Sequence, residues 1–204
     1  VTTNLTRFFR NTAHFDTIKN YVIPDLVKTK SALGEKKIRI WSAGCSTGEE
    51  PYSLAMVMDK YLPPDFTVEI TASDLSLKSL MTAKEGFYPD SRINGVEDSY
   101  LQAYFDKKER GYQIKDKIKQ KIKFDYHNLK LDSGLTGLDM IVCRNVIIYF
   151  DETAQEAVIN RFHKAMNNHS YLFIGHSESL FGMKTEFEFL KTDWACIYRK
   201  FKDH

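Results

Sequence analysis

Three groups of polar residues each follow a stretch that is expected to form a strand, and these residues are the best placed to do chemistry. The first group is residues 43–50, the second is Asp74, and the third is Arg144 with Asn145. In an open α/β sheet, ligands bind beyond the carboxyl ends of the strands, near the point where the strand order reverses. The sequence therefore predicts a binding pocket to which all three groups contribute.

The first group indicates what kind of ligand the pocket takes. It contains two glycines, Gly44 and Gly48, and matches neither the dinucleotide pattern GxGxxG nor the phosphate loop GxxxxGK[ST]. The helix expected to follow opens with Glu49 and Glu50, which would repel a phosphate at its N-terminus and favour a ligand with positive charge. The plainer alternative for a Glu-Glu pair is that both carboxylates complement the helix dipole and face water.

Asp74 lies about 25 residues beyond that loop, the spacing of the acidic residue that binds ribose hydroxyls in nucleotide-binding α/β folds. The alternative is that Asp74 caps a helix over Leu77–Glu85. An acidic ribose ligand beside a loop that disfavours phosphate suits S-adenosylmethionine better than NAD or ATP. That cofactor has one ribose, no phosphate, an ammonium group and a sulfonium cation.

The elements that must position these residues form an α/β domain around a mainly parallel sheet, because short β-branched or aromatic runs alternate with segments of helical period. Thr47 is expected to cap the first long helix, and Gly86 is expected to end the second. Strands are predicted at Lys37–Ser42, Thr67–Ser73, Ile122–His127, Leu138–Cys143 and Ser170–Gly175. Helices are predicted at Glu49–Met58, Leu77–Glu85, Asp98–Phe105 and Glu152–Met166. An antiparallel pair that closes the sheet is predicted at Glu186–Leu190 and Ala195–Arg199.

The middle of the chain breaks this rhythm, and we expect a small inserted subdomain over residues 88–121. A basic segment, Lys107–Lys123, overlaps it and carries eight Lys or Arg residues against two acidic ones. The whole chain has a net charge of only +2, which argues against a general nucleic-acid binder. The basic segment is therefore either a solvated lysine face or a surface that docks on acidic helices.

Composition limits the remaining possibilities. The chain has 204 residues, of which 43% are apolar, enough for one domain with a sizeable core. Its longest apolar runs, such as 146–150, are far shorter than the roughly 20 residues that span a bilayer, so we expect no membrane insertion. Cys45, Cys143 and Cys196 are widely spaced, which predicts neither disulfides nor a metal site and favours the cytoplasm. Cys45 and Cys143 are expected to be buried and inert, and His176 to be structural.

Six spaced motifs resemble one family, the chemotaxis receptor methyltransferases, in their C-terminal catalytic domain. These CheR-type enzymes are protein-glutamate O-methyltransferases that use S-adenosylmethionine. The resemblance implies a Rossmann-like methyltransferase fold over residues 1–204, without the family's N-terminal helical domain. The motifs are Thr3–Arg10, Ile40–Ser53, Ala72–Leu75, His127–Leu129, Cys143–Asp151 and Gly175–Glu178.

The resemblance also implies roles for individual residues. An N-terminal segment would fold over the cofactor, a glycine and a glutamate would hold its methionine end, and Asp74 would bind the ribose. The implied cofactor-binding residues are Asn4, Thr6, Arg10, Gly44, Glu50, Asp74, Asn128, Leu129, Arg144 and Asn145. Arg10 and Tyr149 would lie close to the reacting atoms. Without the resemblance, Arg10 reads as a surface residue that pairs with Asp16 or Glu49, and Tyr149 as a core aromatic.

The implied function is methylation of glutamate side chains on the cytoplasmic helices of chemoreceptors. Some family members grip a receptor's C-terminal peptide through a glycine-rich loop. The matching stretch here, residues 104–114, is short and has one glycine, which argues against such tethering. One alternative is a module that binds S-adenosylmethionine or S-adenosylhomocysteine without turnover. Another, an NAD-dependent oxidoreductase, is weakened by the missing GxGxxG pattern.

Overall fold

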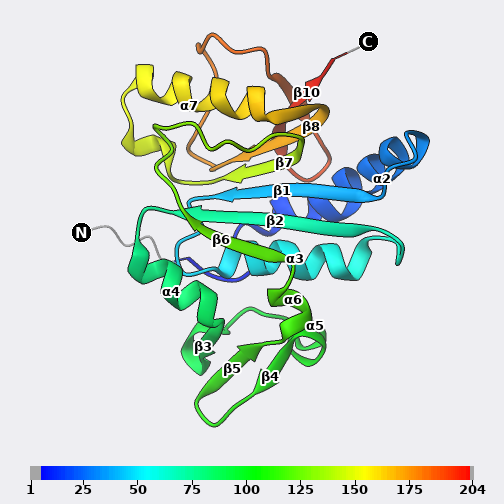
Figure 1. Ribbon diagram of the computed structural model, residues 1–204, viewed down its shortest axis with the longest axis vertical. Coiled ribbons are helices and arrows are strands. Elements are labelled where there is room, and N and C mark those ends of the chain that lie inside the picture. Colours follow the sequence, from blue (N-terminus) through cyan, green and yellow to red (C-terminus); the bar gives the residue numbers. More distant parts are fainter. Residues whose placement is uncertain (1–5, 203–204) are drawn as a thin grey trace.

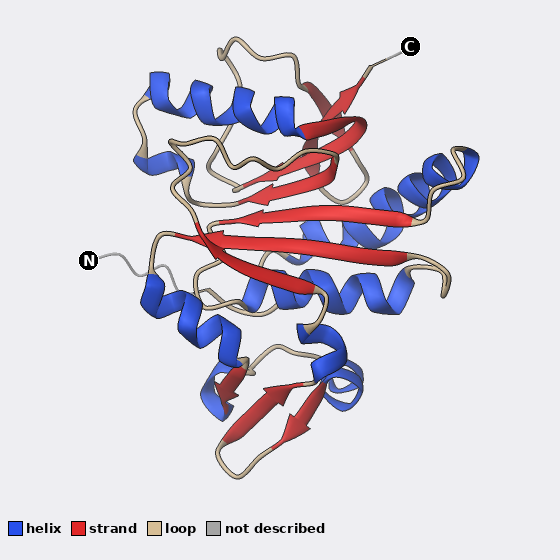
Figure 2. Ribbon diagram, in the orientation of Figure 1, coloured by secondary structure: helices blue, strands red, loops and turns tan. Residues whose placement is uncertain are grey.

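The protein, described here over residues 6–202 of a computed structural model, is built on a seven-stranded sheet with helices on both faces. A smaller three-stranded sheet lies to one side (Figures 1 and 2). The strands of the main sheet are β1 Lys37–Ala43, β2 Thr67–Asp74, β6 Ile122–Tyr126, β7 Leu138–Cys143, β8 Met166–Ile174, β9 Glu188–Lys191 and β10 Cys196–Phe201. The helices that accompany it are α1 Thr12–Thr17, a π-helical turn at Ile18–Val22, α2 Ile23–Ala32, α3 Glu49–Tyr61, α4 Leu77–Glu85 and α7 Glu152–Ala165.

The strand order is β6-β2-β1-β7-β8-β10-β9. The first five strands in this order run parallel, and β10 pairs antiparallel with both β8 and β9. This confirms the predicted mainly parallel sheet with an antiparallel C-terminal strand. The chain runs outward from β1 on one side and from β7 on the other, so the order reverses between these two strands. Ligands of open α/β sheets bind at such a point.

Two cores sandwich the sheet because side chains alternate along each strand. Ile38 and Ile40 of β1 join the core under α2 and α3, whereas Trp41 and Ala43 join the core under α7. Figure 1 shows α7 on one side of the sheet and α2, α3 and α4 on the other. The sheet is thereby held between two apolar layers, and its carboxyl edge can carry polar groups.

The structure differs from the sequence prediction in the segment before β1 and at the start of β8. Helices α1 and α2 and the π-helical turn between them were not predicted, although Ile18, Val22 and Leu26 recur every fourth residue and are buried. That spacing is typical of a helix face and was the available signal. Strand β8 also begins at Met166 rather than at Ser170, because α7 ends at Ala165 and the chain passes directly into the strand.

The small sheet stands between α4 and β6 in the chain and has the order β3-β5-β4. Phe8 of the N-terminal segment packs edge-on against Tyr88 and Phe105 of this sheet, with ring centroids 4.9 and 5.5 Å away. We propose that these elements form the inserted subdomain expected over residues 88–121. They are β3 Phe87–Pro89, a 3-10 turn at Asp90–Arg92, α5 Asp98–Tyr104, β4 Phe105–Lys107, β5 Gly111–Ile114 and α6 Asp116–Lys119.

A buried ion pair fastens α2 to the main sheet and yields a first prediction. Lys30 Nζ lies 2.9 Å from Asp139 Oδ1, and both side chains are almost fully buried. Lys30→Met leaves the Asp139 carboxylate without its cation, so we expect the free energy of unfolding in urea to fall by about 3 kcal/mol. Lys36→Met removes an exposed pair with Asp65 and should cost less than about 1 kcal/mol. Equal losses in the two variants would contradict this expectation.

Candidate active site

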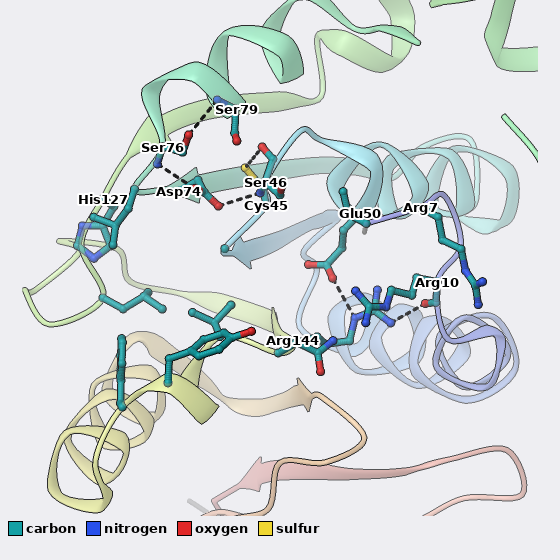
Figure 3. Close-up of a pocket in the computed structure, with 18 residues that line it drawn as sticks. Arg7, Arg10, Cys45, Ser46, Glu50, Asp74, Ser76, Ser79, His127 and Arg144 are labelled. Carbon is teal, nitrogen blue, oxygen red and sulfur yellow. Dashed lines mark hydrogen bonds and ion pairs between the residues drawn. The ribbon is translucent and has the colours of Figure 1, made fainter. Parts of the chain in front are cut away.

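A cavity of about 550 Å³ opens at the carboxyl ends of β1, β2 and β7 (Figure 3). The predicted site residues that line it are Thr6, Arg10, Gly44, Glu50, Asp74, Leu129, Arg144, Asn145 and Tyr149. Asn128 is not among the lining residues, and its side-chain Oδ1 accepts a hydrogen bond from the Lys130 backbone N–H at 2.9 Å. Asn4 lies outside the described residues. The three polar groups singled out in the sequence therefore meet in one place.

The loop after β1 is held close to the end of β2. The backbone N–H groups of Gly44 and Cys45 both donate to the Ser73 carbonyl, at 2.9 and 2.8 Å. Gly44 has φ +81°, and a Cβ there would lie 2.4 Å from Val146 Cγ2. Because that space is already filled, only glycine lets the loop and the β7 turn approach each other this closely.

The start of α3 corrects the predicted cap. The N-cap residue is Gly48, with φ 101° and no side-chain hydrogen bond, so the prediction that Thr47 caps this helix is wrong. The Thr47 hydroxyl donates instead to the Glu49 carboxylate, and its carbonyl accepts from the Tyr88 hydroxyl at 2.6 Å. Side chains of α3 and of the small sheet thus organise the loop.

Glu49 and Glu50 do not face water, so the plainer interpretation of this pair is wrong. Glu49 is fully buried and pairs with Arg92. The Glu50 carboxylate accepts hydrogen bonds from the Ser42 hydroxyl at 2.8 Å and from Arg144 Nε at 2.9 Å. Each glutamate therefore has an arginine partner, and Glu50 lines the pocket as one half of an ion pair.

Arg144 joins three separate parts of the chain. Besides its bond to Glu50, its Nη1 donates to the Arg10 backbone carbonyl at 2.6 Å, and its guanidinium lies over the Phe15 ring. Figure 3 shows Arg144 between Glu50 and the segment that carries Arg10. The position of this segment over the pocket thus depends on Arg144, the residue that directly follows β7.

Asp74 points toward the loop after β1 and is held by backbone groups on both sides. Its Oδ2 accepts from Ser46 N–H at 2.8 Å and its Oδ1 from Ser76 N–H at 2.9 Å. The N-cap of α4 is Ser76, whose hydroxyl accepts from Ser79 N–H, so the alternative of Asp74 as that helix's cap is wrong. Both carboxylate oxygens keep a lone pair that can accept from a ligand.

Tyr149 and Arg10 line the same cavity. Tyr149 is the last residue of the 3-10 turn Ile147–Tyr149 and is 57% exposed, so the alternative of a core aromatic is wrong. Sequence reasoning missed Arg7, Ser46 and His127 as lining residues, although each lies within a quoted motif. Their motif positions were the available signal, but which side chains turn inward depends on the loop conformations.

The nearby thiols and the buried histidine are not suited to catalysis. Burial raises the pKa of Cys45 and of Cys143, which agrees with the expectation of inert cysteines. Burial, with smaller contributions from Arg144 and His176, lowers the pKa of His14 to about 4, so its ring is neutral at pH 7. Within residues 6–202, no three His, Cys, Asp or Glu side chains are grouped so as to hold a metal ion.

The sheet order and the cavity at its carboxyl edge agree with a Rossmann-like methyltransferase that uses S-adenosylmethionine, and the family match shows this class. Residues 4–196 match the family described as CheR methyltransferase, SAM binding domain, and the chain belongs to this family. It is 40% identical to a chemotaxis protein methyltransferase of Borreliella burgdorferi, over 90% of this chain and 67% of that protein. It is 38% identical to chemotaxis protein methyltransferase 1 of Pseudomonas aeruginosa, over 98% of this chain and 74% of that protein.

Among solved structures, the chain is similar to PKMT2 from Rickettsia typhi, with a TM-score of 0.49 and 16% identity over 83% of this chain and 26% of that one. Within the described part of the chain, no helix combines the length and the apolarity needed to cross a bilayer.

The close approach at Gly44 yields a second prediction. Gly44→Ala places a methyl group against Val146, so we expect the affinity for S-adenosylhomocysteine, measured by calorimetry, to fall more than tenfold. Gly34→Ala is the matched control, because Gly34 also has a positive φ but no atom lies within 4 Å of an added Cβ. Both variants should lose about 1–2 kcal/mol of stability from backbone strain. Affinity that drops equally in both would contradict a local effect.

Proposed function

We propose that this protein transfers methyl groups from S-adenosylmethionine to glutamate side chains of chemoreceptors, giving glutamyl methyl esters. Its partners would be the receptors' cytoplasmic helices, and its location the cytoplasm. The observation that carries the proposal is that Arg7, Arg10 and Tyr149 line the same cavity as Glu50 and Asp74. Carboxylates suited to a ribose and an ammonium group thus share one cavity with arginines suited to an anionic acceptor.

The relatives support both the role and turnover. Those in Borreliella burgdorferi and Pseudomonas aeruginosa are named chemotaxis protein methyltransferases. A binding module without turnover would need no group placed for an acceptor, whereas Tyr149 is exposed at the cavity. We therefore favour the enzyme over the sensor alternative.

The residues present fit the cofactor. Asp74, oriented by two backbone N–H groups, would accept hydrogen bonds from the ribose hydroxyls. Glu50 would accept from the ammonium group with the lone pairs that Ser42 and Arg144 leave available. Gly44 lets the loop after β1 pack against Val146, and both residues line the cavity. Thr6, Leu129 and Asn145 would complete the enclosure, and Asn4 and Asn128 stay proposed contacts on the resemblance alone.

The proposed reaction does not require the protein to transfer a proton. S-adenosylmethionine, when bound, supplies a methyl group on a positively charged sulfur. A glutamate acceptor has a pKa near 4.3 and is already ionised at neutral pH, so no general base is required. His14, neutral and buried, is not needed in this role. The protein's task is to align the acceptor oxygen with the methyl group and to exclude water, and alignment alone is worth roughly 7–11 kcal/mol in favourable systems.

Arg10 and Tyr149 would divide the work of holding the acceptor. The negative charge of the acceptor disappears as the ester forms, so a strong ion pair with the ground state would raise the barrier. A neutral hydrogen bond from the Tyr149 hydroxyl positions the carboxylate with less of this cost. Arg10 would mainly attract the acceptor and shape the cavity, with its backbone fixed by Arg144.

The basic segment Lys107–Lys123 stays outside this proposal. Lys107 pairs with Asp90 at 2.9 Å, and Lys121 lies 3.5 Å from Asp59 of α3. Lys119 donates to the Glu85 carbonyl at 3.0 Å. These contacts support a solvated face whose lysines bind neighbouring elements, rather than a surface reserved for a receptor.

The direct test is to incubate the chain with methyl-labelled S-adenosylmethionine and receptor cytoplasmic fragments. We expect label on glutamate that base releases as methanol, as an ester requires. Receptor fragments with the acceptor glutamates changed to alanine serve as the control. Binding of the cofactor without any transfer would favour the sensor alternative, and base-stable label would point to another acceptor.

Asp74 provides a third prediction. Asp74→Ala removes charge-assisted hydrogen bonds to the ribose, which we expect to weaken cofactor binding by about 1.5–3 kcal/mol, or roughly 10- to 150-fold in Kd. Asp125→Ala, an exposed aspartate on β6, should leave Kd unchanged in the same calorimetric titration. Unchanged affinity in Asp74→Ala would mean that this carboxylate only holds the loop after β1.

Tyr149 provides a fourth prediction. Tyr149→Phe removes one hydroxyl from an exposed ring, so kcat for methyl transfer should fall about tenfold while cofactor Kd and stability stay near wild type. Tyr126→Phe changes a tyrosine of similar exposure on β6 and should have no effect. A parallel loss of affinity and kcat in Tyr149→Phe would instead indicate a packing role.

A further inference from the structure

A buried carboxylate that does not line the cavity lies directly behind its wall. Glu178 follows the end of β8 and is only 9% exposed. Its Oε1 accepts from the backbone N–H groups of Gly175, at 2.7 Å, and Asn145, at 2.8 Å. Its Oε2 accepts from the Ile148 N–H at 3.2 Å. One side chain thereby gathers three backbone donors from two turns.

The two turns meet because β7 and β8 are parallel neighbours whose ends, Cys143 and Ile174, lie side by side. The fit between them is tight. A Cβ on Gly175 would lie 2.6 Å from both Asn145 Oδ1 and Glu178 Oε1. Asn145 itself has φ 62°, a left-handed conformation that costs free energy for a residue with a side chain. The Glu178 hydrogen bonds offset that cost and hold the turn in one conformation.

The turn after β7 bears the residues that the proposed reaction uses. Arg144 and Asn145 begin it, and Tyr149 ends it. The Tyr149 ring is 57% exposed, so packing of the ring fixes it only partly. The Glu178 bonds at positions 145 and 148 bracket the intervening backbone, and the second of them is adjacent to Tyr149. A displacement of about 1 Å at a reacting centre can lower the rate 10²-fold. Loss of these two hydrogen bonds is therefore expected to lower kcat.

We propose that Glu178 is a positioning residue that acts on methyl transfer through Tyr149, by holding the backbone of the turn after β7. This inference rests on the proposed function for the role of Tyr149. The two ends of the carboxylate have separate effects. Oε1 maintains Asn145 on the cofactor side, whereas Oε2 maintains Ile148 on the acceptor side.

Glu178→Gln separates these ends. The Gln carbonyl oxygen can still accept from Asn145 and Gly175, but its NH₂ group then faces the Ile148 N–H, donor against donor. We expect kcat, followed as S-adenosylhomocysteine release, to fall at least tenfold, with Kd for S-adenosylhomocysteine within threefold of wild type. Glu186→Gln is the matched control, because Glu186 is exposed and pairs with Lys202. An unchanged kcat, or an equal loss of affinity, overturns the proposal.

A double-mutant cycle with Tyr149→Phe tests whether Glu178 acts through that residue. The kcat of the double variant should be well above the value expected if the two single fold-losses multiplied. The second change removes a contribution that the first has already disabled. Losses that multiply would assign Glu178 a general structural role. Release of S-adenosylhomocysteine is counted whatever residue accepts the methyl group, so failure of the glutamate assignment stays distinguishable from failure of this inference.

Amide exchange provides a readout that does not require turnover, and one part of it needs only the wild-type chain. In the wild-type chain, the Ile148 amide should exchange as slowly as the amides of β7, although it lies in a short turn. In Glu178→Gln its exchange should become at least tenfold faster, while that of Asn145 changes little. Fast exchange of Ile148 in the wild-type chain overturns the proposal by itself, including in the case that the variant does not fold.

Discussion

The ion pair between Arg144 and Glu50 is the interaction on which the rest of the site depends. It joins the end of β7 to the first turn of α3, across the point where the strand order reverses. The same guanidinium binds the Arg10 carbonyl and so places the N-terminal segment over the cavity. Because Arg144 is 9% exposed, little solvent weakens these contacts. One side chain, Arg144, therefore fixes the start of α3, the end of β7 and the N-terminal segment relative to one another.

Pairing of charges also explains how a site with several ionised groups tolerates burial. Glu49 meets Arg92, Glu50 meets Arg144, and Asp74 accepts two backbone N–H groups. A buried carboxylate without such partners would be costly. The carboxylates at the cavity are therefore paired and oriented, and their remaining lone pairs lie beside arginine side chains. That arrangement suits a cofactor with both an ammonium group and a ribose, and an acceptor that is itself an anion.

Much of this could be predicted from local pattern, and the failures have physical causes. The helix over Leu77–Glu85 was predicted with both its bounds, because Gly86 supplies the left-handed residue that ends it. The prediction that Thr47 caps α3 was wrong because Gly48, with its positive φ, occupies the N-cap position one residue later. The Thr47 hydroxyl binds the Glu49 carboxylate instead. The partners of Glu49 and Glu50 lie 43 and 94 residues away along the chain, and no local rule identifies them.

By itself, the sequence determined the α/β class, the parallel core strands and the three polar groups at their carboxyl ends, because period, strand length and strand-end position are local properties. It also placed Gly44 and Asp74 in one pocket, since parallel strands deliver their ends to one edge. Only the tertiary structure decided which carboxylates are paired, that Tyr149 is exposed, and that Glu178 accepts hydrogen bonds from the turn after β7. Those outcomes depend on side chains that meet across neighbouring turns, and such contacts exist only once the sheet has assembled.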